Sequence, residues 1–148
     1  MSDSATDYGQ RLPSDMLPRL EPAPPSALVV EDDEMLRTLY VTAFRLRGFV
    51  VDEAEFAEVA IDRLLERQYD VLVVDVMLPT ESGVYVVDKV RSLPDPKPDI
   101  IVITGADSSA VRAIDRSHVK AILFKPISIN ALMAFAAEIV VERRARGD

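Results

Sequence analysis

Short, mostly apolar runs recur along the chain at fairly regular intervals. Each run is rich in valine, isoleucine or leucine and is bounded by charged, glycine or proline residues, which is typical of a strand buried on both faces. The pattern predicts strands at 27–30, 49–53, 71–75, 99–104 and 120–124.

The stretches between these runs carry apolar residues three or four positions apart, which is the pattern of an amphipathic helix. They predict helices at 34–48, 56–68, 82–93, 108–117 and 128–144. Asp33 and Ser128 are suited to cap helix N-termini, and Gly48 is suited to end the first helix. The closing ERRARGD (142–148) is expected to be a solvated helix end, where arginines complement the helix dipole.

Strands that alternate with helices predict an α/β domain, because parallel strands need crossover connections. We therefore expect a five-stranded parallel sheet with helices on both faces, spanning residues 26–146. Residues 1–25 are rich in serine, aspartate and proline and end in EPAPP. Such a segment buries too little apolar surface to offset the entropy of ordering it, so we expect a flexible N-terminal tail.

Composition narrows the possible partners. The chain has 148 residues and a formal net charge of −8, which argues against non-specific binding to nucleic acid or anionic membranes. It has no cysteine, which excludes disulfides, thiolate metal sites and a thiol nucleophile. No apolar run approaches the ~20 residues of a membrane span, and the N-terminus lacks a signal-peptide pattern. We expect a cytoplasmic protein that binds neither nucleic acid nor membrane.

Polar residues of defined types follow or end four of the five predicted strands. Glu31 and Asp32 come directly after the first strand, Asp75 and Thr104 end the third and fourth, and Lys125 follows the fifth. In an open parallel sheet the carboxyl ends of the strands lie at one edge, where ligands bind. The sequence therefore predicts one polar site built from distant segments.

The charges of this predicted site are not balanced. Glu31, Asp32 and Asp75 are acidic and Lys125 is basic, so one divalent cation would make the site neutral. Oxygen ligands without cysteine or histidine favour a hard ion, and Mg²⁺ needs few protein ligands because it keeps several waters. A carboxylate beside Mg²⁺ and a lysine, with the Thr104 hydroxyl in reach, is equipped to accept a phosphoryl group.

These residues, in this order, resemble the receiver domain of two-component response regulators. The matching features are the acidic pair in VVEDD (29–33), the aspartate in VVDVMLP (73–79), Gly83 in ESG, Thr104 in VITGA (102–106), and Lys125 with Pro126 in FKP. Each motif is weak alone, but together, with their spacing, they are specific. The resemblance covers residues 26–146 and implies the flavodoxin-like (βα)5 fold.

The resemblance also implies a role for each matched residue. Asp75 would be the phosphoacceptor. Asp32 would be the principal acidic Mg²⁺ ligand, with Glu31 acting through a metal-bound water and the Met77 backbone carbonyl as a further ligand. Thr104 would hydrogen-bond the phosphoryl group and move toward it on activation, and Lys125 would pair with a phosphoryl oxygen. The Lys125–Pro126 peptide is commonly cis in the family.

The implied function is a phosphorylation-controlled switch that receives its phosphoryl group from a histidine kinase or a histidine phosphotransfer protein. It would signal by binding a downstream protein, without an output domain of its own. It would not be a turnover enzyme, although it takes part in its own phosphorylation and autodephosphorylation.

Family members commonly dimerise or bind partners through the surface formed here by 108–117, 120–124 and 128–144, so the resemblance makes a homodimer through this surface possible, while the sequence does not determine the oligomeric state. Ile122 stands where the family usually has tyrosine or phenylalanine, three residues before the lysine. Coupling between Thr104 and this surface would therefore use packing alone or another residue such as Phe124 or Phe135. Gly105 is a second departure, since alanine is more usual there.

Some of these residues also fit simpler roles. Asp33 is better explained as a helix N-cap than as a metal ligand, and Asp70 as a structural residue at the opposite edge of the sheet. A receiver-like interaction module that is never phosphorylated is an alternative, although the intact acids, threonine and lysine argue against it. A dehalogenase-type phosphohydrolase needs a second aspartate where this chain has Met77. A dinucleotide-binding enzyme needs a glycine-rich G-x-G-x-x-G motif after the first strand, and the chain lacks one there.

Overall fold

The five predicted strands form one parallel sheet in the computed structural model, which describes residues 13–16, 22–78, 82–105 and 109–148. In chain order they are β1 (Ser26–Val30), β2 (Val50–Ala54), β3 (Val71–Asp75), β4 (Asp99–Thr104) and β5 (Val119–Phe124). Their order in the sheet is β2-β1-β3-β4-β5, and every neighbouring pair is parallel. The strand order therefore reverses between β1 and β3, and a ligand site is expected at the carboxyl ends of these two strands.

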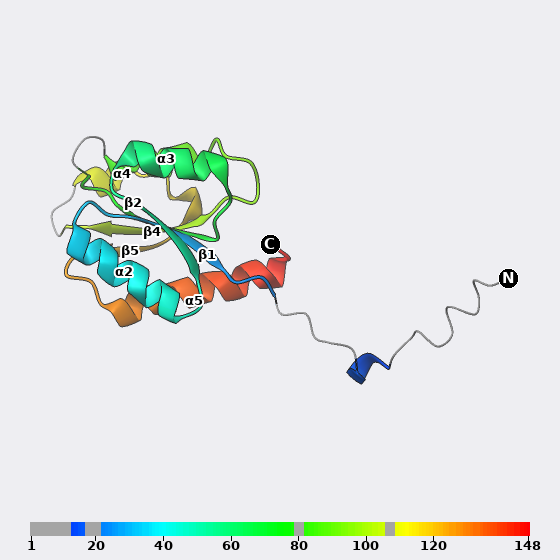
Figure 1. Ribbon diagram of the computed structural model, residues 1–148. Coiled ribbons are helices and arrows are strands. Elements are labelled where there is room, and N and C mark those ends of the chain that lie inside the picture. The colour runs from blue at the N-terminus through cyan, green and yellow to red at the C-terminus, as the bar shows by residue number, and fades with distance from the viewer. Residues whose placement is uncertain (1–12, 17–21, 79–81, 106–108) are drawn as a thin grey trace.

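Helices cover both faces of this sheet (Figure 1). Helices α2 (Glu34–Leu46) and α5 (Ile129–Arg146) lie on one face, and α3 (Ala57–Glu66) and α4 (Gly83–Val90) lie on the other. Strands β1, β3 and β4 are almost entirely buried as a result, which explains their continuous apolar runs. Within the described ranges, no helix combines the length and the apolar composition needed to cross a bilayer.

Neighbouring side chains of a strand enter different cores. Leu28 and Val30 of β1 pack into the core beneath α3 and α4, whereas Ala27 and Val29 pack into the core beneath α2 and α5. This alternation follows from the two-residue repeat of a strand. The predicted fold, a five-stranded parallel sheet with helices on both faces, is confirmed.

The three residues predicted at helix ends, Asp33, Gly48 and Ser128, are confirmed in these roles. Asp33 accepts a hydrogen bond from the Leu36 amide at 2.9 Å, and Ser128 accepts one from the Ala131 amide at 3.1 Å, so both are N-caps. Gly48 has a φ of 86°, the left-handed conformation that commonly follows a helix C-terminus. These local signals work because each depends on residues within a few positions of the helix end.

The predicted helix at 108–117 is wrong. The described part of this stretch forms two 3₁₀ segments, η2 (Ser109–Ala113) and η3 (Arg116–His118). Asp115 separates them, because it accepts a hydrogen bond from the Ser117 amide at 3.0 Å and lies 2.7 Å from the Arg91 guanidinium. So short a stretch gains little from helix propensity. Strand β5, the last strand of the sheet, is only partly buried, unlike the central strands β3 and β4.

The expectation of a solvated C-terminal helix end is wrong at Arg143, which is 3% exposed. Its guanidinium lies 3.2 Å from Oδ1 of Asp70 and 3.0 Å from Oδ2 of Asp99, and donates to the Lys97 carbonyl at 2.9 Å. Asp70 also accepts from the Ser26 amide at 2.8 Å. Arg143 thus ties α5 to the amino edge of the sheet, meaning the side on which the strands begin, and Asp70 is structural, as predicted.

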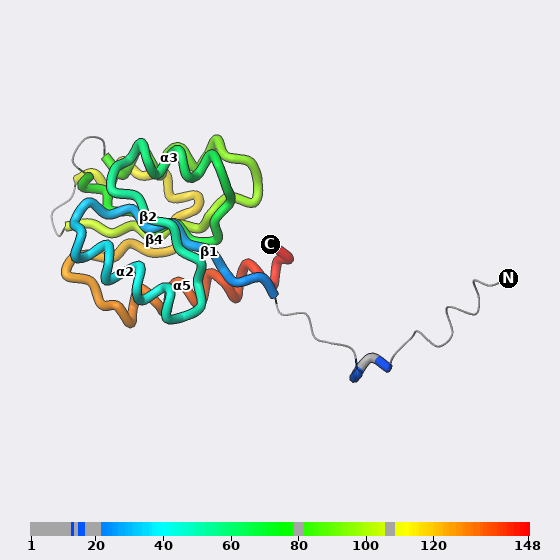
Figure 2. Tube along the Cα trace, viewed as in Figure 1, coloured from blue at the N-terminus to red at the C-terminus, as the bar shows by residue number. Residues whose placement is uncertain are grey.

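The predicted flexible tail falls largely on residues 1–12 and 17–21, which lie outside the described residues. Between them, Ser14–Met16 form one 3₁₀ turn, η1. Residues 22–25 lie beside the end of α5 (Figure 2), where the Ala23 carbonyl accepts a hydrogen bond from Arg144 at 3.1 Å. The last residues of the predicted tail therefore contact the domain.

Candidate functional site

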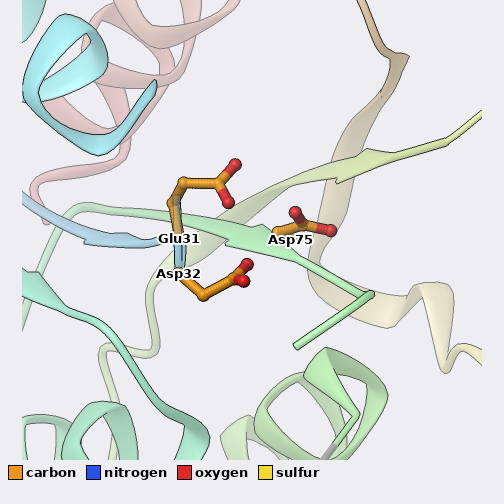
Figure 3. Close-up of side chains that lie close together, drawn as sticks. All are labelled: Glu31, Asp32 and Asp75. Atoms are coloured by element: carbon orange, nitrogen blue, oxygen red, sulfur yellow. The ribbon is translucent and has the colours of Figure 1, made fainter. Parts of the chain in front are cut away.

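Three carboxylates meet at the carboxyl edge of the sheet, at the point where the strand order reverses. Glu31 and Asp32 follow β1 and Asp75 ends β3, and the side chains of the first two point toward Asp75 (Figure 3). One oxygen from each residue lies within 4.8 Å of the others. Glu31 is 1% exposed and Asp75 2% exposed, so the cluster sits in a low-dielectric environment in which like charges repel strongly.

Lys125 reaches into this cluster from the end of β5. Its Nζ lies 2.6 Å from Oδ2 of Asp75 and 2.9 Å from Oε1 of Glu31. Burial disfavours the ammonium charge, but the close carboxylates of Asp75 and Glu31 outweigh it and raise the pKa of Lys125. The Lys125–Pro126 peptide is cis, as the family resemblance implies; Asp95–Pro96 is also cis, which the sequence did not suggest.

Glu31 is a buried carboxylate whose set of hydrogen bonds is incomplete. Its Oε2 accepts a hydrogen bond from the Asp33 amide at 3.1 Å. Its Oε1 contacts Lys125 at 2.9 Å but finds no partner in hydrogen-bond geometry among the described residues. Burial raises the pKa of Glu31 to about 7, a shift opposed by Lys125 and the Asp33 amide and reinforced by Asp75. A buried oxygen with an unused lone pair is a position that a cation would stabilise.

The Asp75 carboxylate is held at both oxygens. Oδ2 contacts Lys125, and Oδ1 accepts a hydrogen bond from the Met77 amide at 2.8 Å. These two contacts fix the orientation of the carboxylate. Met77 follows β3 directly beside the site, while the predicted role of its carbonyl as a metal ligand stays a prediction.

Gly83 allows α4 to begin against the end of β3. A Cβ at this position would lie 2.1 Å from the Asp75 carbonyl oxygen and 2.7 Å from Cα of Val76, so no other residue fits without displacement. The Gly83 amide also donates to the Val76 carbonyl at 3.1 Å. The sequence pointed to Gly83 through the family resemblance alone, because only the fold shows what it approaches.

Thr104 lies at the same edge, at the end of β4. It is fully buried, and its Oγ1 donates to the Gly105 carbonyl at 3.3 Å, which is a long hydrogen bond. Its own carbonyl accepts from the Lys125 amide at 2.8 Å, and the preceding Ile103 pairs with Asp75 in the sheet. The backbone of Thr104 therefore lies next to the residues before and after it in the site, Asp75 on β3 and Lys125 after β5, and its hydroxyl has only one long hydrogen bond.

A cavity of about 480 Å³ opens next to Lys125. It is lined by residues of α2 and of the segment after β5: Leu36, Leu39, Tyr40, Lys125, Pro126 and Ile127. Tyr40 is 1% exposed, and burial together with the nearby Glu31 charge raises its pKa to about 12. The site is therefore bordered by an apolar surface on the side from which Lys125 enters.

Ile122 and Phe135, the residues expected at a partner surface, are both partly buried. Ile122 packs against the core beneath α3 and α4, and Phe135 against the core beneath α2 and α5. Phe124, in register with Thr104, is 53% exposed and is the exposed hydrophobic side chain of β5. Phe124 thus offers more surface to a partner than either of them.

The donor set of the site fits Mg²⁺. Glu31, Asp32 and Asp75 supply hard carboxylate oxygens, and no cysteine or histidine belongs to the cluster. When all three acids are ionised and Lys125 is counted, the cluster keeps two negative charges, and Oε1 of Glu31 has an ion pair with Lys125 but no hydrogen bond. Glu31, Asp32 and Asp75 could hold the ion, with Lys125 in contact with two of them.

Comparison with known proteins identifies the family. The model of the response regulator receiver domain matches residues 27–137. The sensory transduction protein LytR of Staphylococcus haemolyticus is 34% identical over 107 residues, covering 71% of this chain and 41% of that protein. The phosphate regulon regulator PhoB of Rhizobium meliloti is 35% identical over 113 residues, covering 74% and 49%. The chain thus spans about half the length, or less, of these curated relatives.

Solved structures agree with this family. A putative response regulator from Chloroflexus aurantiacus has 28% identity and a TM-score of 0.71, with 80% of this chain and 98% of that chain covered. The response regulator TrrA of Thermotoga maritima, solved in complex with Mg²⁺ and BeF, has 23% identity and a TM-score of 0.67, with 78% and 98% covered, and supports the fold alone. The chain belongs to the response regulator receiver domains of two-component signalling.

Proposed function

We propose that Asp75 accepts a phosphoryl group, with Mg²⁺ as the required ion, from a phosphohistidine of a histidine kinase or a histidine phosphotransfer protein. The observation that carries this proposal is the incomplete charge balance around Asp75. Its carboxylate is oriented by Lys125 and Met77, beside two further acids and a buried oxygen that lacks a hydrogen bond. Such a cluster is stabilised by a divalent cation and by the oxygens of a phosphoryl group bound to it.

In this reaction an Asp75 oxygen attacks phosphorus in line, the phosphorus–nitrogen bond of the donor histidine breaks, and the imidazole nitrogen retains the electron pair. Bound Mg²⁺ would neutralise charge on the transferring oxygens. Lys125 exchanges its contact with the Asp75 carboxylate for one with a phosphoryl oxygen. Thr104 gives up its 3.3 Å hydrogen bond to Gly105 and donates to another phosphoryl oxygen.

The phosphodonor protein docks on the apolar cavity beside Lys125. This surface is continuous with the site through Lys125, and Leu39, which lines it, is 48% exposed. Met35, on the first turn of α2, is 83% exposed. A donor that places its histidine near Asp75 from this side buries these apolar side chains, which favours association.

The phosphorylated chain acts by binding a downstream protein, and movement of Thr104 reaches that partner through β5. Phe124 supports this route, since it pairs with Thr104 in the sheet and is exposed. Ile122 and Phe135 contribute by packing, and a homodimer through the surface of η2, β5 and α5 is part of the same proposal. The acyl phosphate is lost by autodephosphorylation, so the chain is a switch and not a turnover enzyme. It acts in the cytoplasm.

The test of phosphorylation uses acetyl phosphate with and without Mg²⁺, followed by intact-mass measurement of the wild type, Asp75→Asn and Asp33→Asn. Asp33→Asn is a matched control, because asparagine also caps a helix and the Asp33 carboxylate is not one of the three in the cluster. We expect one phosphoryl group on the wild type and on Asp33→Asn, only with Mg²⁺. Unmodified wild type, or an Asp75→Asn variant that is still labelled, would contradict the proposal.

The docking surface is tested with the variant Leu39→Arg. We expect slower transfer from a phosphorylated histidine phosphotransfer protein and unchanged labelling by acetyl phosphate, which needs no protein surface. Equal transfer rates from the protein donor to wild type and to Leu39→Arg would contradict docking at this cavity without affecting the assignment of Asp75.

A further inference from the structure

Arg37 is a partly buried cation that the proposed phosphoryl transfer does not use. It lies in the first half of α2, and its side chain is 13% exposed. Its Nη1 donates to the Glu31 backbone carbonyl at 2.9 Å, and its Nε donates to Oε1 of Glu53 on β2 at 2.9 Å. One guanidinium therefore joins the loop that carries the acids to the neighbouring edge strand.

The Glu31 carbonyl lies where the ladder of β1 ends. The last paired residue of β1 is Val30, opposite Ala54 on one side and Val74 on the other. Beyond it, the Glu31 amide donates to the Ala54 carbonyl at 3.1 Å, and the Glu31 carbonyl accepts from Arg37. This carbonyl belongs to the peptide that joins Glu31 to Asp32, so its orientation sets the directions in which both side chains leave the chain.

We propose that Arg37 is a positioning residue for the cation site. By holding the Glu31–Asp32 peptide, it aims the two carboxylates at Asp75, and Glu53 holds Arg37 in turn. This inference rests on the proposed Mg²⁺-dependent function. Groups that orient metal ligands typically affect metal affinity by about 10- to 100-fold when they are removed.

Positioning and charge predict opposite results for the loss of Arg37. A guanidinium near the site repels Mg²⁺, so removing its charge would strengthen Mg²⁺ binding if electrostatics alone acted. Removing the hydrogen bond to Glu31 frees the loop and weakens Mg²⁺ binding if Arg37 positions the ligands. The sign of the change in affinity therefore separates the two explanations.

The experiment is calorimetric titration of the full chain with MgCl₂, for wild type, Arg37→Gln, Arg37→Lys and Glu53→Gln. We expect Arg37→Gln to bind Mg²⁺ about 10- to 100-fold more weakly. Arg37→Lys, which keeps one charged donor, should regain part of this loss. Glu53→Gln removes a charge but keeps a side-chain oxygen that can accept from Nε of Arg37, so Arg37 stays held and Mg²⁺ affinity should stay close to that of wild type.

Urea unfolding without Mg²⁺ accompanies each titration, because a merely structural role would lower stability without changing the affinity of the folded fraction. An Mg²⁺ affinity of Arg37→Gln equal to or tighter than wild type would overturn the inference while leaving the proposed function intact. If Arg37→Gln does not fold, Arg37→Lys decides, and an affinity equal to wild type overturns the inference. Wild type that fails to bind Mg²⁺ would overturn the proposed function itself.

Discussion

The two edges of the sheet each carry a cation between two carboxylates, yet only one of them is a candidate for chemistry. At the carboxyl edge, Lys125 lies between Asp75 and Glu31 at 2.6 and 2.9 Å. At the amino edge, Arg143 lies between Asp70 and Asp99 at 3.2 and 3.0 Å. In both arrangements a basic residue from the C-terminal part of the chain contacts acids at the ends of the sheet strands.

The difference lies in how completely each cluster is satisfied. At the amino edge, Arg143 and Arg146 balance Asp70 and Asp99, and Asp70 gains a further hydrogen bond from Ser26. At the carboxyl edge, Asp32 adds a third carboxylate, and Oε1 of Glu31 lacks a hydrogen bond. A ligand site is therefore recognised by charges that its own residues do not neutralise and by buried polar atoms that they do not hydrogen-bond.

The choice of cation fits this difference. Arg143 uses its planar guanidinium to contact Asp70, Asp99 and the Lys97 carbonyl at once, which suits a permanent structural joint. Lys125 presents a single ammonium on a flexible stem, which can move from a carboxylate to a phosphoryl oxygen. An arginine in place of Lys125 would hold the acids more rigidly and exchange partners less readily.

The largest effect is expected at the amino edge. Arg143→Ala leaves Asp99, a buried acid, with only the more distant Arg146 at 3.5 Å, and removing one partner of a buried ion pair costs about 3–5 kcal/mol. Urea unfolding measures this loss. Arg144→Ala, the adjacent exposed arginine, is the control, with an expected change below about 1 kcal/mol. Similar stabilities of the two variants would show that the amino edge is no structural joint.

Mg²⁺ should stabilise the wild type through the carboxyl edge alone. At a concentration one hundred times its dissociation constant, a ligand of the folded state adds about 2.7 kcal/mol to the free energy of unfolding. Thermal unfolding with MgCl₂ or with EDTA measures this gain. The gain in stability should be unchanged in Arg144→Ala and lost in Asp32→Asn. If Mg²⁺ does not stabilise the wild type, the carboxyl edge is not a cation site and does not differ from the amino edge in this respect.

Gly83→Ala should destabilise the chain by about 2 kcal/mol, the usual range for overpacking, because the new Cβ meets the backbone of Asp75 and Val76. Helix propensity alone predicts the opposite sign, since alanine favours helices over glycine by up to about 1 kcal/mol. Gly105→Ala is the matched control, because a Cβ there has no atom within 4 Å. A stability gain in Gly83→Ala would show that α4 can shift without cost.

Asp32→Asn should give the smallest effect and the opposite sign. Without Mg²⁺, removing one of three neighbouring carboxylate charges relieves repulsion and should raise the free energy of unfolding by about 1 kcal/mol. Asp33→Asn, next to it, keeps its cap and should change stability little. A loss of stability in Asp32→Asn would mean that the carboxyl edge is already balanced.

Much of the fold and of the site could be predicted from local patterns. The strand ends that carry Glu31, Asp32, Asp75, Thr104 and Lys125 lie where the apolar runs indicated, and parallel pairing brings them to one edge. Asp33, Gly48 and Ser128 act as the helix-end residues that their types suggest. These features were predictable because each depends on a few consecutive residues and on one general rule of parallel sheets.

The failures come from residues whose state depends on distant partners. The stretch 108–117 has helical spacing, but Asp115 pairs with Arg91, 24 residues earlier, and divides it. Arg143 is buried because Asp70 and Asp99, 73 and 44 residues away, meet it at the amino edge. No local pattern marks Arg37 as a partner of the Glu31 carbonyl, because that contact requires α2 to pack beside β1 and β2.

The sequence by itself determined the order of strands and helices, the segments that end at the carboxyl edge, and the acidic excess gathered there. Only the tertiary structure decided which charges are neutralised within the fold and which remain available to a ligand. The physical reason is that the energy of a charge depends on its burial and on its neighbours in space, and both arise from the packing of the whole chain.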